Sequence, residues 1–267
     1  MTGLTLVACD LDQTLIYSRR SAAAPVDTAR CVEIYQDRPQ SFMTPAAAEA
    51  VGALTGAGVF AAVTSRTREQ LARITLPGPP PRFAVAANGG RLLVDGVEDL
   101  DWSREVERRA TEGTPLAEVE DHVAQLCRPE WTTARKVAEG LFVYAVVDLA
   151  LMPDDTVATA AAWAAEHDWS FSAQGRKLYW IPRGVSKGAA ARELVARTGA
   201  TTLLAAGDSH LDRDLLEAAD GGWLPRHGEL ALAGWRADHV EITDGVGLAA
   251  GEQIAVALAG RALGVPA

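Results

Sequence analysis

The sequence predicts an α/β protein in which a parallel-sheet core is interrupted by an inserted α+β domain. Apolar strand-like runs alternate with helical patterns at both ends of the chain, whereas in the middle each helical stretch is followed by a pair of strands. The expected core comprises residues 1–90 and 183–267, and the expected insert is 91–182. A chain of 267 residues, 48% of them hydrophobic, is long enough for two such parts.

Three short apolar runs predict buried strands in the first core segment, at 4–8, 59–63 and 83–87. A helix is expected from Thr44 to Gly58, because Thr44 is a good cap and Pro45 suits a first turn. A short helix is expected over 67–74. The second core segment predicts, in order, a helix at 186–198, a strand at 201–206, a helix at 211–219, a short strand at 222–224 and a helix from about residue 252.

The insert predicts a separate layer of helices and strands. Helices are expected over 101–127 and 153–167, and strands over 131–138, 141–147, 169–173 and 177–181. The last two strands should form a hairpin around Gln174-Gly175.

Charge and composition limit the classes of binding partner and the cellular compartment that the sequence predicts. The formal net charge of −10 disfavours nucleic acid and anionic membranes as general partners. No apolar run is long enough for a spanning helix, and the N-terminus does not resemble a signal peptide. Three scattered cysteines fit a reduced, cytoplasmic protein. The oligomeric state is left open.

Polar residues follow four of the expected core strands. They are Asp10 and Asp12, Thr64 and Ser65, Asn88, and Asp208 and Asp212. Ligands of open parallel sheets bind beyond the carboxyl ends of the strands, so these residues should share one rim, where Lys187 would add a cation from a helix start. Carboxylates gathered there repel one another unless a cation neutralises them, and an oxygen-only ligand set favours Mg²⁺.

These residues resemble the four motifs of the haloacid dehalogenase (HAD) superfamily in order and spacing. The matching segments are Asp10-Leu11-Asp12-Gln13-Thr14, Thr64-Ser65-Arg66, Lys187, and Gly207-Asp208-Ser209 through Asp212. The insert resembles the type-two cap of the sugar-phosphatase branch. The resemblance, which covers the whole chain, implies a Rossmann-like core with a cap domain. The sequence departs from it at Leu211, where many relatives have asparagine.

The resemblance implies a catalytic role for two aspartates and a phosphate-binding role for three other residues. Asp10 would attack phosphorus and form an aspartyl-phosphate, and Asp12 would protonate the leaving oxygen and later activate water. Thr64, Ser65 and Lys187 would bind the phosphoryl group. Mg²⁺ would be held by Asp10, the main-chain carbonyl of Asp12, and Asp208, with Asp212 as a further direct or indirect ligand.

Five residues are weaker candidates for substrate contact, namely Arg66, Asn88, Gly89, Arg176 and Lys177. Asn88-Gly89 is equally typical of a tight turn, and Arg176-Lys177 of a solvated hairpin turn. His210 is expected to be an exposed residue at a helix start.

The sequence therefore predicts a Mg²⁺-dependent phosphomonoester hydrolase. Its substrate would be a small phosphorylated metabolite, such as a sugar phosphate or a related polyol or nucleoside phosphate. Two alternatives stay open: a phosphomutase or other phosphotransferase of the same superfamily, and a non-catalytic binding or regulatory module on the same fold.

Overall fold

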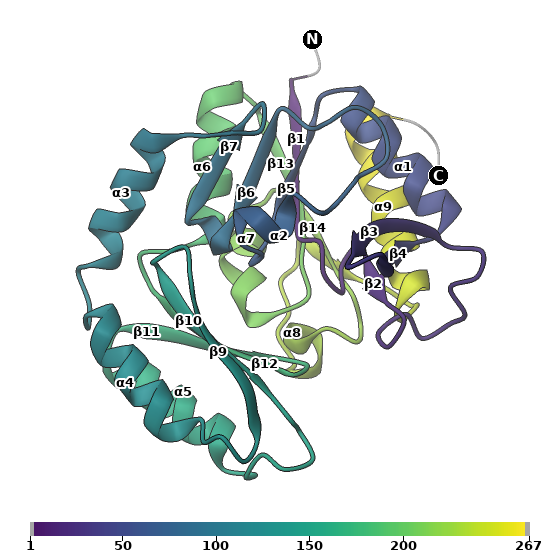
Figure 1. The fold of residues 1–267 in the computed structure, drawn as a ribbon. Helices are drawn as coiled ribbons and strands as arrows, with labels where there is room; N and C mark the ends of the chain where they lie inside the picture. Colours follow the sequence, from purple (N-terminus) through teal and green to yellow (C-terminus); the bar gives the residue numbers. More distant parts are fainter. Residues whose placement is uncertain (1–2, 265–267) are drawn as a thin grey trace. The chain divides into compact units, whose positions relative to one another are not determined.

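The computed structural model describes residues 3–264 and forms two compact units. The first unit takes the chain up to Asp99 and from Lys187 onward, and the second is Leu100–Ser186 (Figure 1). Between residues 3 and 264, no helix combines the length and the apolar character that crossing a membrane requires.

An eight-stranded sheet forms the centre of the first unit. Its order is β15 (Val240–Ile242), β14 (Gly221–Leu224), β13 (Thr202–Ala206), β1 (Thr5–Cys9), β5 (Phe60–Val63), β6 (Phe83–Ala86), β7 (Arg91–Val94) and β8 (Val97–Glu98). The first six of these strands pair in parallel, and β7 and β8 are antiparallel. The expected fold class, a parallel-sheet core with a separate α+β part, is confirmed.

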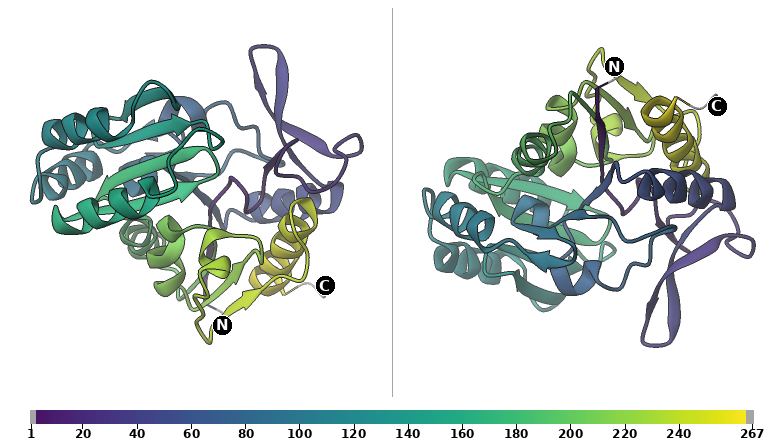
Figure 2. Two further views of the ribbon diagram at one scale, coloured as in Figure 1. Left: turned by 90° about the horizontal axis from the view of Figure 1, so that it is seen from below. Right: turned by 90° about the horizontal axis from the view of Figure 1, so that it is seen from above.

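Helices cover both faces of this sheet. On one face α1 (Pro45–Gly56) packs against α9 (Leu248–Leu263), and α6 (Lys187–Thr198) and α7 (Arg213–Glu217) lie on the opposite face (Figures 1 and 2). Thr44 caps α1 as expected, because its hydroxyl accepts a hydrogen bond from Ala47 N at 3.1 Å.

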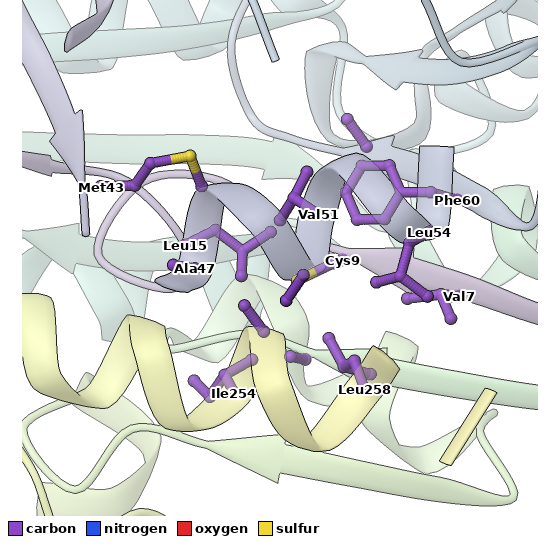
Figure 3. Packing of buried hydrophobic residues seen from close by; sticks show 14 of the residues in the cluster. Val7, Cys9, Leu15, Met43, Ala47, Val51, Leu54, Phe60, Ile254 and Leu258 are labelled. Atoms are coloured by element: carbon purple, nitrogen blue, oxygen red, sulfur yellow. The ribbon is translucent and has the colours of Figure 1, made fainter. Parts of the chain in front are cut away.

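The main apolar core lies between β1, α1 and α9. Figure 3 shows Val7 and Cys9 of β1 packed among Val51 and Leu54 of α1 and, from α9, Ile254 and Leu258; all six are fully buried. This packing fixes the end of β1, where the first acidic motif begins.

A second, antiparallel sheet of the first unit has no counterpart among the expected elements. Its strands are β2 (Tyr17–Ser18), β3 (Arg30–Tyr35) and β4 (Arg38–Met43), and the β3–β4 hairpin projects from the rest of the unit (Figure 2). Gln36 and Asp37 form its turn, both with positive φ. Such turns are usually signalled by Asn-Gly or Asp-Gly, and this one carries no glycine.

The second unit is an antiparallel sheet packed with helices. The strand order is β11 (Trp169–Gln174), β12 (Lys177–Pro182), β10 (Phe142–Val147) and β9 (Thr132–Ala138). Two helices, α4 (Leu116–Leu126) and α5 (Thr156–Glu166), pack on this sheet, and the ring of Trp163 stacks between those of His122 and His167.

Several boundaries differ from those expected. The second unit starts at Leu100 instead of residue 91, because β7 and β8 continue the core sheet. The expected helix over 101–127 is two helices, α3 (Leu100–Ala110) and α4, since Gly113 and Pro115 interrupt it.

Three other helices were predicted with wrong limits. The one expected over 67–74 is only α2 (Arg68–Leu71), and α9 begins at Leu248 rather than near residue 252. The helix expected over 211–219 is a 3₁₀ turn, His210–Asp212, followed by α7. A short helix, α8 (Glu229–Leu232), follows β14 and was not expected.

Replacing Leu54 with alanine should lower the free energy of unfolding by about 2–5 kcal/mol, because it opens a cavity in the fully buried core between α1 and α9. Chemical denaturation would measure the change. The matched control is Leu232→Ala, also in a helix of the first unit but 76% exposed, which should change stability by less than about 0.5 kcal/mol. Equal effects of the two variants would contradict this description of the core.

Candidate active site

The four predicted motifs meet at the carboxyl edge of the central strands. Asp10 follows β1, Thr64 follows β5, and Asp208 lies two residues beyond β13. The N-terminal residue of α6, Lys187, reaches the same place. This juxtaposition follows from parallel pairing, which aligns the ends of β1, β5 and β13.

Lys187 connects two carboxylates that lie far apart in the sequence. Its ammonium donates to Asp10 Oδ1 at 2.6 Å and to Asp212 Oδ1 at 2.5 Å. All three side chains are buried, with Lys187 only 1% exposed. Thr14 Oγ1 lies 3.5 Å from the other oxygen of Asp10. Buried charges persist in a protein only when they are paired in this way.

Asp212 is held in place by its own loop despite the departure at Leu211. Its Oδ2 accepts hydrogen bonds from Asp208 N at 3.1 Å, Ser209 N at 3.0 Å and Ser209 Oγ at 2.8 Å. Gly207 permits this arrangement, since a Cβ built there would lie 2.3 Å from the Asp212 Cβ. The Ser-x-x-Asp spacing is a sequence signal of such a reciprocal cap. Leu211 itself is buried, and His210 is exposed as expected.

The buried acidic residues have perturbed proton affinities. Burial raises the pKa of Asp10 to about 7, with Lys187 opposing the shift and Asp212 and Asp12 adding to it. Burial, together with Asp212 and Asp10, raises the pKa of Asp208 well above its usual range. Burial alone would lower the pKa of Lys187, but Asp10 and Asp212 raise it, so the ammonium stays charged.

The acidic cluster fits a hard divalent cation. Asp10, Asp208 and Asp212 each offer a carboxylate oxygen, and these atoms lie within 4.8 Å of one another. All three side chains are buried, and the ligand atoms are oxygens only, which suits Mg²⁺ better than zinc. Three carboxylates against the single ammonium of Lys187 also leave negative charge that a cation would neutralise.

The turn after β6 is tied to the segment after β5. Asn88 N donates to Thr64 O at 2.9 Å, and Ala87 N donates to Arg66 O at 2.7 Å. Ala87 and Asn88 both have positive φ, so Asn88-Gly89 does form a tight turn, between β6 and the antiparallel β7. Thr64 is fully buried, and its Oγ1 accepts from Arg66 N at 3.2 Å. Because the hydroxyl acts as acceptor there, its proton remains available for another group.

Arg66 joins Asp12 to a residue that sequence reasoning missed. Its Nε and Nη2 donate to Asp12 at 2.6 and 2.8 Å, and its Nη1 and Nη2 donate to Glu33 of β3 at 2.9 and 3.0 Å. Glu33 is 6% exposed, whereas Asp12 is 45% exposed. Glu33 belongs to none of the four motifs, and it was missed because the hairpin that carries it was not expected.

The remaining predicted residues lie in different places. Ser65 is half-buried and lies between Thr64 and Arg66, and Gly89 is buried in the turn after β6. Arg176 and Lys177 belong to the second unit, at the turn and the start of β12, where the Lys177 ammonium lies 6.0 Å from the ring centre of Tyr144.

A comparison of the sequence with protein-family models finds no match, and neither does a comparison with curated proteins. Solved structures do show similarity over nearly the whole chain. A sucrose-phosphatase from Synechocystis, in complex with sucrose and phosphate, superimposes with a TM-score of 0.63 at 15% identity and covers 94% of this chain and 95% of its own.

Two further structures have the same architecture. A trehalose-6-phosphate phosphatase related protein gives a TM-score of 0.58 at 16% identity over 98% of this chain and 100% of its own. A haloacid dehalogenase-like hydrolase from B. subtilis gives 0.57 at 14% identity over 95% of this chain and 98% of its own. The expected resemblance is thereby confirmed at the level of structure: the chain has the fold of the HAD superfamily phosphatases.

Proposed function

We propose that the protein is a Mg²⁺-dependent phosphomonoester hydrolase that acts through an aspartyl-phosphate on Asp10. The observation that carries this proposal is the buried cluster at the end of β1, where the Asp10 carboxylate is held by Lys187 beside Asp208 and Asp212. Phosphoryl transfer depends mainly on positioning and charge neutralisation, and this cluster can supply both.

In the first half-reaction a carboxylate oxygen of Asp10 attacks phosphorus as the bond between phosphorus and the leaving oxygen breaks. Lys187 fixes the Asp10 carboxylate and offsets negative charge in the transition state. Asp12 donates a proton to the leaving oxygen. Its partial exposure and its place two residues after the nucleophile suit that role, although in this structure its carboxylate is bound to Arg66.

In the second half-reaction water attacks phosphorus of the aspartyl-phosphate. Asp12, now a carboxylate, takes a proton from that water, and phosphate leaves as Asp10 is regenerated. Asp10, Asp208, Asp212 and the main-chain carbonyl of Asp12 would hold Mg²⁺, which supplies charge neutralisation for the phosphoryl oxygens.

Thr64 and Ser65 are proposed to hydrogen-bond the phosphoryl group. The Thr64 hydroxyl already accepts from the Arg66 amide, which leaves its proton to be donated. Asn88, Gly89, Arg176 and Lys177 are proposed substrate contacts. Arg66 is a further one, although in this structure its guanidinium is bound by Asp12 and Glu33.

The proposed substrate is a small phosphorylated metabolite, either a sugar phosphate or a related polyol or nucleoside phosphate. Similar structures include a sucrose-phosphatase and a protein related to trehalose-6-phosphate phosphatase, which supports the sugar-phosphate class. The formal charge of −10 supports a small ligand over nucleic acid or an anionic membrane.

Asp10→Asn should lower the rate of phosphate release by at least about 1,000-fold, because it removes the attacking carboxylate. The measurement is phosphate release from a panel of metabolites, with Mg²⁺ and with a chelator. Asp27→Asn, the same change at an exposed position of the first unit, should retain the wild-type rate. Full activity of Asp10→Asn would disprove the aspartyl-phosphate mechanism, and sugar-phosphate isomerisation without phosphate release would favour the phosphotransferase alternative.

Stabilisation by Mg²⁺ should be stronger at about pH 8 than at about pH 5.5. The pKa of Asp10 rises from 3.8 in an unperturbed carboxyl to about 7 in the folded protein, so the folded metal-free protein holds an extra proton between these values. The stabilisation from that proton is complete below pH 3.8 and is lost as the pH rises through about 7. Mg²⁺ must displace the proton at low pH, whereas at high pH it relieves carboxylate repulsion.

Thermal unfolding with and without Mg²⁺ at the two pH values would measure this difference. In Asp208→Asn, which lacks one carboxylate of the cluster, the Mg²⁺-dependent shift should be small at both. An equal shift at both pH values in the wild type would contradict a metal site that includes Asp10.

A further inference from the structure

The guanidinium of Arg66 is bound by carboxylates on two of its edges. The edge formed by Nε and Nη2 faces Asp12, and the edge formed by Nη1 and Nη2 faces Glu33. Each contact is bidentate, which fixes the plane of the guanidinium as well as its position. Arg66 is only 11% exposed, so it has little freedom to adopt another position.

Glu33 is the firmly held member of this pair of carboxylates. Ser41 Oγ of the neighbouring strand donates to its Oε2 at 2.5 Å, and Arg73 Nε lies 3.7 Å from its Oε1. Burial alone would raise the pKa of Glu33, but the hydrogen bonds from Arg66 and Ser41 outweigh it and lower that pKa. Glu33 therefore remains a carboxylate.

The strand that carries Glu33 is hydrogen-bonded on both sides. On one side Glu33 pairs with Ser41 of β4, and on the other β3 contacts the segment that follows α2. Thr75 N donates to Val32 O at 2.8 Å, and Glu33 forms a bridge with Ile74. The hairpin is thus fixed to the segment that begins with Thr64 and Arg66, and Glu33 can act as a rigid anchor.

Asp12 is the more exposed member of the pair. Its side chain is 45% exposed, against 6% for Glu33. In the proposed mechanism the Asp12 carboxyl must turn toward the leaving oxygen, which requires it to loosen its contact with Arg66. Without Glu33, the guanidinium would then keep, among residues 3–264, only the 3.5 Å hydrogen bond to the Gln70 carbonyl.

We propose that Glu33 is a positioning residue for the proton-transfer step: it holds Arg66 beside Asp12, so that Arg66 orients the Asp12 carboxyl without following its movement. This inference rests on the proposed function. The plainer interpretation, that Glu33 only stabilises the β3–β4 hairpin, makes a different prediction for the kinetics.

The test compares two phosphate esters that differ in their need for a proton donor. Glycerol phosphate has an alkoxide leaving group that must be protonated, whereas the leaving group of p-nitrophenyl phosphate departs readily without a proton. Glu33→Gln should lower kcat/KM, which reports the steps up to loss of the leaving group, by about 10- to 100-fold for glycerol phosphate and by less than about 3-fold for p-nitrophenyl phosphate. A merely structural defect would lower both rates by the same factor, and that result would overturn the proposal.

Two further variants make the comparison specific. Glu98→Gln also removes a carboxylate that pairs with arginines of the first unit, Arg68 and Arg91, and should leave both rates unchanged. Ser41→Ala removes only the hydroxyl that supports Glu33, and should produce a smaller loss, confined to glycerol phosphate, of about 2- to 5-fold. If Glu98→Gln also lowered the rate for glycerol phosphate by about 2-fold or more and left the rate for p-nitrophenyl phosphate unchanged, Glu33 would have no special role.

A second measurement is independent of catalysis. The Nη1–H signal of Arg66, whose nitrogen donates to Glu33, should be resolved and slow to exchange in the NMR spectrum of the wild type, assigned by its loss in Arg66→Lys, and broadened or lost in Glu33→Gln. An unchanged signal would overturn the positioning role. If the wild type cleaved neither ester, that would count against the proposed function, and the NMR comparison alone would decide whether Glu33 anchors Arg66.

Discussion

A buried lysine is costly unless anions surround it, and Lys187 satisfies this condition with two carboxylates at once. Its ammonium brings together Asp10 from the end of β1 and Asp212 from the loop after β13. The pairing is incomplete in charge, because Asp208 adds a third carboxylate within 4.8 Å of the others. Two negative charges are left when all three are ionised. A divalent cation is the simplest species that neutralises these two charges. Without it, protons are the remaining source of positive charge, which is why the pKa values of Asp10 and Asp208 are raised.

The geometry of the cluster depends on packing some distance from it. Val7 and Cys9 lie in the apolar core between α1 and α9 (Figure 3). This packing fixes the position of β1 and therefore of Asp10, which directly follows it. Directly after the neighbouring strand β13, Gly207 has no side chain, which lets the Asp212 carboxylate approach the backbone and accept hydrogen bonds from Ser209. Hydrophobic burial therefore positions Asp10, and local hydrogen bonding positions Asp212.

The parts of this arrangement that short-range patterns encode could be predicted from the sequence. Buried strands ending at Asp10, Thr64 and Asp208 were expected from apolar runs, and their meeting at one rim followed from parallel pairing. The β3–β4 hairpin could not be predicted in the same way, because its turn at Gln36 and Asp37 lacks glycine. The division between the units was misplaced because an insert was expected directly after the Asn88-Gly89 turn, whereas the chain first adds two antiparallel strands to the core sheet.

The contrast between the two acidic clusters of the first unit explains why only one resembles a metal site. Around Lys187, carboxylates outnumber cations, and they are buried with their oxygens directed at one another. Around Arg66, the carboxylates of Asp12 and Glu33 lie on different edges of one guanidinium, and Arg73 adds a second cation near Glu33. Charge there is nearly balanced without any ion, and the two carboxylates are separated by the guanidinium rather than turned toward a common point. The first cluster thus needs a cation to reach neutrality, whereas the second already contains its own and is suited to orienting Asp12.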